Sequence, residues 1–152
     1  MKSKEYKRRF KIAAYTERWA VTMAKVCIRQ VVAKTPFPRW HLVNFSGPDG
    51  GESRGVVDLV AIRKDHSAPR AGTKRDDAFQ IILIQVKGGY AAKPTVEDGK
   101  RLRAVARHHH AHQVLLAAWK KGKAPRFFSL RPKVNSGSGD WLEVSDLRSI
   151  FQ

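Results

Sequence analysis

The stretch Ile81–Gly89, with the sequence IILIQVKGG, is an almost continuous apolar run that nevertheless contains Gln85 and Lys87. A run of this kind is typical of a strand buried on both faces of a sheet. The stretch Gly55–Arg63, GVVDLVAIR, has the same character and contains Asp58. A buried amide, amine or carboxylate is costly unless a partner compensates it. A divalent metal ion and a phosphate would suit these three groups.

Strand alternation makes a specific arrangement of the polar groups possible. Successive side chains in a strand point to opposite faces, so Gln85 and Lys87 share a face. If the two runs form neighbouring strands, Asp58 lies beside them. Asp58 would supply a hard oxygen ligand for Mg²⁺ or Mn²⁺, and the Gln85 side-chain carbonyl and Val86 backbone carbonyl would complete the protein's share. Lys87 would then reach a water nucleophile or a phosphate.

A long helix is predicted from about residue 4 to residue 33, where Pro36 and Pro38 follow. Its apolar residues recur at helical spacing: Phe10, Ala13, Ala14, Ala20, Val21, Ala24, Cys27, Ile28 and Val31. Glu17 occupies a core-facing position of this stripe. A fully buried Glu is rare unless it is paired or functional. We therefore expect the helix to deliver Glu17 toward Asp58.

The remaining patterns predict a single α/β domain over residues 1–152, with the order α-β-β-β-α-β-β-α. The predicted strands are residues 40–45, 55–63, 78–87, 113–119 and 126–130. Residues 64–77 form a polar loop, and residues 46–54 a turn. Thr95, with Asp98 three residues on, is expected to cap a second helix that ends near residue 110. Residues 134–152 are interpreted as a C-terminal extension with a short helix capped by Ser145.

The formal net charge of +17 implies a polyanionic partner, with nucleic acid first and an anionic membrane surface second. Candidate phosphate-binding residues fall in several clusters: Lys7, Arg8, Arg9, Lys11, Arg54, Lys100, Arg101, Lys120, Lys121 and Lys123. Cys27 is the only cysteine, so no intrachain disulfide is possible, which is compatible with a reducing cytosol. We expect a cytoplasmic protein, associated with the nucleoid if the cell is bacterial or archaeal. We expect no signal peptide and no membrane span.

The order Glu17, Asp58, Gln85-Val86-Lys87, on a helix and two strands that a helix and a strand then follow, resembles the PD-(D/E)xK nuclease superfamily. The resemblance covers roughly residues 16–119. It is greatest to the virus-type replication-repair nuclease module and the archaeal Holliday-junction resolvases. It implies a restriction-endonuclease-like core, a mixed sheet flanked by helices, and Mg²⁺- or Mn²⁺-dependent hydrolysis of DNA phosphodiester bonds.

In the resemblance, Asp58 is the metal-binding Asp, Gln85 stands at the second acidic position, Lys87 is the motif lysine and Glu17 the helical acid. Two residues depart from the pattern: Gln85 replaces the usual Glu, and Val57 replaces the Pro before Asp58. The expected activity is a structure- or junction-directed endonuclease of DNA repair or recombination. A homodimer is also expected from the resemblance.

Other interpretations stay open. Asp58 would instead form a structural ion pair with Arg54 or Arg63, and Gln85 and Lys87 would lie on an exposed edge strand. Glu17 would pair with an Arg or mark a slightly rotated helix face. At the level of function, the chain would be a basic nucleic-acid-binding module that has lost catalysis, or a component of a ribonucleoprotein. DNA is favoured over RNA as the partner.

Overall fold

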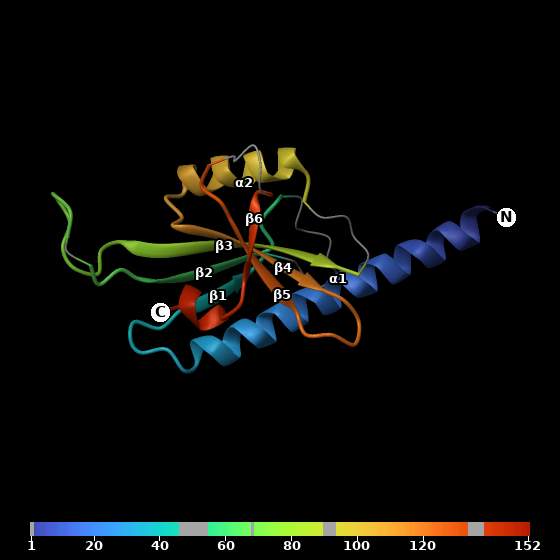
Figure 1. Ribbon diagram of the computed structural model, residues 1–152, viewed down its shortest axis with the longest axis horizontal. Helices are drawn as coiled ribbons and strands as arrows, with labels where there is room; N and C mark the ends of the chain where they lie inside the picture. The colour runs from blue at the N-terminus through green and yellow to red at the C-terminus, as the bar shows by residue number, and fades with distance from the viewer. Residues whose placement is uncertain (1, 46–54, 68, 90–93, 134–138) are drawn as a thin grey trace.

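A six-stranded mixed sheet with the strand order β1-β2-β3-β4-β5-β6 forms the centre of the fold. The computed structural model describes residues 2–45, 55–67, 69–89, 94–133 and 139–152. Figure 1 shows α1 along one face of the sheet and α2 across the other. The elements are α1 (Lys2–Val32), β1 (His41–Asn44), β2 (Leu59–Lys64), β3 (Phe79–Gly88), α2 (Val96–His108), β4 (Gln113–Trp119), β5 (Arg126–Leu130), β6 (Trp141–Val144) and a 3₁₀ helix, η1 (Leu147–Ile150).

The strands β3 and β4 are parallel, and the other neighbouring pairs are antiparallel. Parallel neighbours need a crossover connection, and α2 lies within that connection. Thr95 caps α2 in the predicted capping box: its Oγ1 accepts the Asp98 N–H, and Asp98 Oδ2 accepts the Thr95 N–H. The carboxyl ends of β3 and β4 therefore meet at one end of the sheet, next to the start of β2.

Alternation along β3 divides the core between the two helices. Ile82, Ile84 and Val86 pack in the cluster that contains the buried residues of α1. Leu83 packs on the other face with Leu102 of α2 and with apolar residues of β4 and β5. The side chains of Gln85 and Lys87 share this second face with Leu83.

The first helix is confirmed over almost the predicted range, and it contains no glycine or proline. In its C-terminal half Ala20, Ala24 and Ile28 are fully buried. In its N-terminal half Ile12 and Tyr15 are exposed, and Figure 1 shows this part of α1 extending beyond the sheet. The side chains of Phe10, Ala13 and Ala14 lie outside the described part of the chain.

The prediction that Glu17 is buried is wrong, because Glu17 is exposed. Glu17 does lie three and seven residues before the buried Ala20 and Ala24, and so on the same helical face. The sheet ends near this point of α1, so the face has no strand to cover it.

The C-terminal residues also differ from the predicted order, because β6 is an additional strand beside β5. β6 has only four residues, and sequence spacing identifies such a short strand poorly. Asp146 rather than Ser145 caps η1. Phe151 is fully buried, and its backbone oxygen accepts a 2.9 Å hydrogen bond from Trp40 Nε1. The C-terminal residues thus contribute Phe151 to the fold's core, whereas the predicted turn at 46–54 lies outside the described residues.

Gly88 allows α1 to approach β3 closely. A Cβ at this position would lie 2.8 Å from the Ala20 Cβ and 3.0 Å from the backbone oxygen of Thr16. Real Cβ atoms essentially never approach another heavy atom as closely as 2.8 Å. The absence of a side chain at Gly88 therefore sets the distance between the helix and the strand.

We predict that Gly88→Ala destabilises the protein by about 1–3 kcal/mol, the usual cost of overpacking. This cost exceeds the gain of about 0.4–1 kcal/mol from a less flexible unfolded chain. Urea unfolding followed by circular dichroism measures the difference. Gly139→Ala is the matched control, because a Cβ there meets nothing within 4 Å. Equal stability of the Gly88 variant and the parent would contradict the close approach.

Candidate functional site

One pocket of about 720 Å³ collects the residues that the sequence singled out. Glu17 of α1, Asp58, Gln85, Val86 and Lys87 all line it. It lies where β3 ends and β2 begins, beside the exposed part of α1. Helix and strands therefore place these five residues around one space, although Glu17 comes from the helix on the opposite face of the sheet.

Asp58 stands directly before β2, which begins at Leu59 rather than at the predicted Gly55. The pair Leu59–Ile84, continued by one residue, places Asp58 opposite Gln85. The Asp58 N–H donates to the Ile84 backbone oxygen at 2.9 Å. The next ladder position is different: the Val86 N–H donates to Asp58 Oδ2 at 2.7 Å. The ladder thus passes from the main chain to a carboxylate, which fixes the carboxylate's orientation.

Gln85 is buried, with 5% of its surface exposed, yet it lines the pocket. Its Oε1 has no hydrogen-bond partner within the described part of the chain. A buried carbonyl without a partner costs roughly 1–3 kcal/mol. An oxygen in this state, beside an oriented carboxylate, fits a hard cation such as Mg²⁺ or Mn²⁺.

The central position of β3 excludes the interpretation of Gln85 and Lys87 as residues of an edge strand, because β3 pairs with both β2 and β4. Arg63 lies within β2, where its side chain donates to Gln80 and to the Gln152 backbone oxygen, each at 2.6 Å. Arg54, the other suggested partner of Asp58, lies outside the described residues.

Among the described residues, the carboxylates that line the pocket are those of Glu17 and Asp58. Over the described ranges, no group of three or more His, Cys, Asp or Glu side chains is placed to hold a metal ion. A cation in this pocket would therefore depend on amide and backbone oxygens, from Gln85 and Val86, in addition to the two carboxylates. Such an oxygen-only set suits Mg²⁺ better than zinc.

Lys87 is half-buried at the same pocket. Its ammonium group also interacts electrostatically with the carboxylate of Asp98 at the start of α2. The hydrogen bond from the Thr95 N–H lowers the pKa of Asp98, and the charges of Lys87 and Arg101 lower it further. The sequence predicted Asp98 as a capping residue. It did not indicate that Asp98 interacts with Lys87, because this proximity depends on where the crossover connection places α2 relative to β3.

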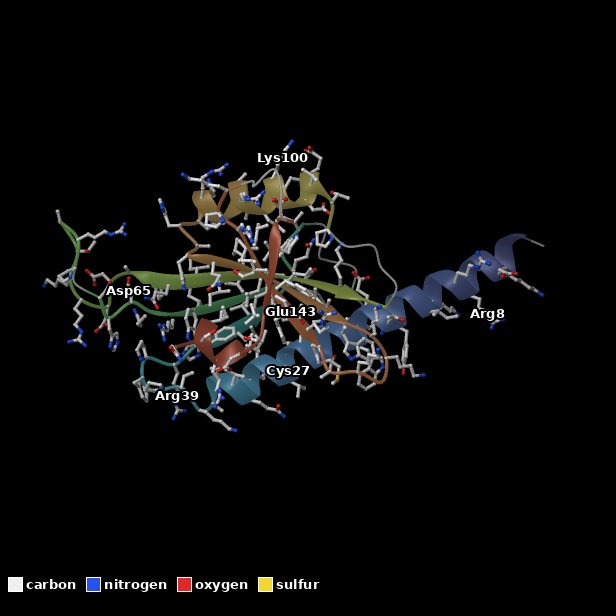
Figure 2. The ribbon with its side chains drawn as sticks, viewed as in Figure 1. Arg8, Cys27, Arg39, Asp65, Lys100 and Glu143 are labelled. Carbon is white, nitrogen blue, oxygen red and sulfur yellow. The ribbon has the colours of Figure 1, made fainter. Side chains whose placement is uncertain are left out.

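The predicted phosphate-binding residues divide into two groups: the first lies at the pocket or on the adjoining part of α1, and the second lies on α2. Arg9, Lys120 and Lys121 line the pocket, and Lys123 lines the neighbouring cavity. Lys7, Arg8 and Lys11 are exposed on the part of α1 that extends beyond the sheet, where Figure 2 shows Arg8. Arg9 also forms an exposed ion pair with Glu5 at 3.2 Å.

Lys100 and Arg101 belong to the second group, which is exposed on α2 and does not line the pocket. Figure 2 shows Lys100 on the outer side of α2, and it pairs with Glu97 at 2.9 Å. Arg54 lies outside the described residues. The basic surface near the pocket is therefore made by α1 and by the connection between β4 and β5.

Sequence reasoning missed several uncharged residues of the pocket wall. Ile12 and Thr16 of α1 also line the pocket, as do Gly88 and Gly89, which follow Lys87. Thr16 Oγ1 donates to the Ile12 backbone oxygen at 2.9 Å, so its hydroxyl is bound within the helix. The glycine pair was the one available signal, since glycines often mark a close approach of backbone to a ligand or to another element.

Comparison with known proteins gave no matching family model, no matching curated protein and no matching solved structure. Among the described helices, none is both long and apolar enough to cross a membrane.

We predict that Mn²⁺ stabilises the parent protein and that Asp58→Asn removes this effect. A ligand that binds only the folded state at ten times its Kd raises the Tm by about 4 °C for a chain of this size. Asn retains an oxygen to accept the Val86 N–H but removes the charge. Differential scanning fluorimetry with and without Mn²⁺ measures the shift.

Asp65→Asn is the matched control, because Asp65 also accepts a backbone N–H, from Ser67 at 2.9 Å, and lies outside the pocket. An equal Mn²⁺ shift in both variants would remove Asp58 from the metal site.

Proposed function

We propose that this chain is a metal-dependent endonuclease that hydrolyses phosphodiester bonds in DNA. The observation that carries the proposal is the single pocket lined by Glu17, Asp58, Gln85, Val86 and Lys87. The order of elements from α1 to β4, with β3 and β4 parallel, supports a restriction-endonuclease-like core, which the sequence resembles. The net charge of +17 supports a polyanionic substrate.

The residues that line the pocket would have different roles in hydrolysis. Asp58, Glu17 and the Gln85 and Val86 carbonyls would hold Mg²⁺ or Mn²⁺. When bound, such an ion lowers the pKa of a coordinated water and offsets negative charge on phosphate oxygens. The Val86 N–H keeps Asp58 oriented before substrate arrives. The Lys87 ammonium would donate hydrogen bonds to the attacking water or to a phosphate oxygen, where negative charge grows during the reaction.

The basic residues favour recognition of DNA structure over sequence. Arg9, Lys120 and Lys121 line the pocket from two different elements, and Lys7, Arg8 and Lys11 extend along α1. Contacts of Lys and Arg with phosphates position the protein but carry no sequence information directly. A junction or branch would present phosphates on several sides of the pocket, which this distribution of charge fits.

We predict that Lys87→Met lowers the rate of Mg²⁺-dependent cleavage of branched DNA by at least about 100-fold, since it removes a charged donor from the reacting phosphate. DNA binding should weaken only slightly, because many other basic residues remain. Single-turnover gel assays and fluorescence anisotropy measure the two quantities. Lys64→Met is the control: Lys64 lies at the opposite end of β2, over the Phe79 ring. Parent-like cleavage by Lys87→Met would contradict the assigned role.

A second candidate function is a DNA-binding module that has lost catalysis. Gln85 favours it, because an uncharged amide stands where the resemblance expects an acid, and two carboxylates line the pocket. One missing negative charge weakens the attraction for a divalent cation. Binding to DNA would be unaffected by this loss.

Gln85→Glu distinguishes the two candidates. If the parent is a nuclease, the variant should bind Mn²⁺ more tightly, and parent and variant should both cut. If catalysis has been lost through Gln85, only the variant should cut. Titration of Mn²⁺ by isothermal calorimetry and the same cleavage assay measure these outcomes. Absence of cleavage by both proteins, with Mn²⁺ binding intact, would count against the endonuclease proposal.

A further inference from the structure

A second cavity, of about 490 Å³, lies directly beside the first and shares Lys87, Gly89 and Lys120 with it. Strand register explains the continuity. Gln85 pairs with Leu116, and Leu116 pairs with Phe128. Residues directly opposite each other project to the same face of a sheet. The floor of the second cavity is thus the same sheet face that presents Asp58, Gln85 and Lys87.

Small and aromatic residues shape this cavity. Ala118 lies between Lys87 and Arg126 in the register, and its short side chain leaves the floor low. Phe128 and Trp141 are half-buried and line the cavity. α2 packs over the neighbouring row, where Leu102 contacts the cluster of Leu83, Val114 and Leu130. The part of the face at Ala118 and Phe128 therefore remains open.

The charges around the cavity are mainly positive. Lys87, Lys120 and Lys123 line it together with Arg126, which lies 5.3 Å from the Phe128 ring centre. Arg126 is also held by Glu143 in two hydrogen bonds of 2.8 and 2.7 Å. Among the described lining residues the one carboxylate is that of Asp140, and the buried Arg103 pairs with it at 3.1 Å. Lys87, Lys120 and Lys123 thus give this aromatic cavity a positively charged wall that would attract an anion.

We propose that this cavity binds one unpaired nucleotide of the DNA substrate. The base would lie against Phe128 and Trp141, and its phosphate near Lys87, Lys120 and Lys123. Aromatic surfaces next to basic side chains are the usual site for unpaired bases, and stacking tolerates any base. A base within a duplex is already paired and stacked, so entry is easiest for one in a single-stranded arm.

This inference rests on the proposed function and narrows it. If Lys87 acts on the scissile phosphate, the unpaired nucleotide lies immediately next to the point of cleavage. The favoured substrates would then be branched DNA molecules with a single-stranded arm, rather than fully paired duplexes.

The test is a binding measurement in EDTA, where metal-dependent cleavage does not occur. The probe is a DNA duplex with a short single-stranded arm, which carries at its first unpaired position either 2-aminopurine or an abasic sugar. Fluorescence anisotropy at fixed salt should show about tenfold tighter binding of the probe that has the base. The 2-aminopurine fluorescence should fall on binding as the base stacks.

Two variants should reduce the tenfold difference to about one. Phe128→Leu keeps an apolar side chain but removes the aromatic face, and Ala118→Leu fills the floor. Phe79→Leu is the control, because Phe79 is exposed, has Lys64 4.7 Å from its ring centre and lies at the opposite end of β3. Thermal melts verify that each variant folds.

Equal affinity of the parent for the base and abasic probes would overturn the proposal, as would a tenfold preference retained by both Phe128→Leu and Ala118→Leu. Either result would leave the endonuclease proposal standing, because no cleavage is measured. Conversely, base-dependent binding by a protein that never cuts DNA would support the cavity and refute the nuclease.

Discussion

The close contact between α1 and β3 at Gly88 determines the geometry of the whole site. Thr16 and Ala20 approach a position where no side chain is present. Glu17 follows Thr16 in the helix, and Lys87 precedes Gly88 in the strand. The contact therefore places a carboxylate from one side of the sheet near an ammonium group that projects from the other side. A larger residue at Gly88 would move α1 away from β3, and Glu17 away from Lys87 with it.

The hydrogen bond from Val86 to Asp58 shows how the sheet itself orients the carboxylate of the candidate site. Up to Ile84 and Leu59, the two strands pair through their backbones. One step further, a carboxylate takes over as the acceptor. The end of regular pairing between β2 and β3 coincides with the polar part of β3. Gln85 is thus buried among apolar residues at the point where the ladder opens, and its Oε1 has no hydrogen-bond partner within the described part of the chain.

The sequence predicted the elements whose patterns are local. β4 and β5 have the predicted bounds, because each is an apolar run of strand length between breaking signals. The capping box of Thr95 and Asp98 also depends on residues only three positions apart. The face of α1 that carries Glu17 was predicted correctly, but its burial was not. Periodicity indicates which face of a helix packs on the rest of the protein. It does not indicate how far the sheet extends beneath that face, and this extent decides whether Glu17 is buried.

The same distinction explains the other differences. Asp58 lies within an apolar run, yet β2 starts only after it, at Leu59. Val56, in the same run, packs in the cluster that contains Leu102 of α2 and is not part of a strand. β6 has too few residues to produce a pattern, and its pairing with β5 becomes evident only in three dimensions. The convergence of Glu17, Asp58 and Lys87 was predicted in outline, from polar residues in apolar settings. Their common pocket required the register, the crossover through α2 and the approach at Gly88.

The part of α1 that extends beyond the sheet would allow the molecule to contact DNA well outside its pocket. From Glu17 back to Lys4, the helix rises by about 20 Å. If the pocket holds the scissile phosphate, the helix spans about six base pairs of an adjoining duplex, at roughly 3.4 Å per pair. The footprint on DNA would then be set by a rigid rod of exposed Lys and Arg, while the chemistry is confined to the sheet. The affinity for DNA and the rate of cleavage would then respond to different conditions. Added salt would weaken the phosphate contacts along α1, whereas the arrangement of Asp58, Gln85 and Lys87 would not change.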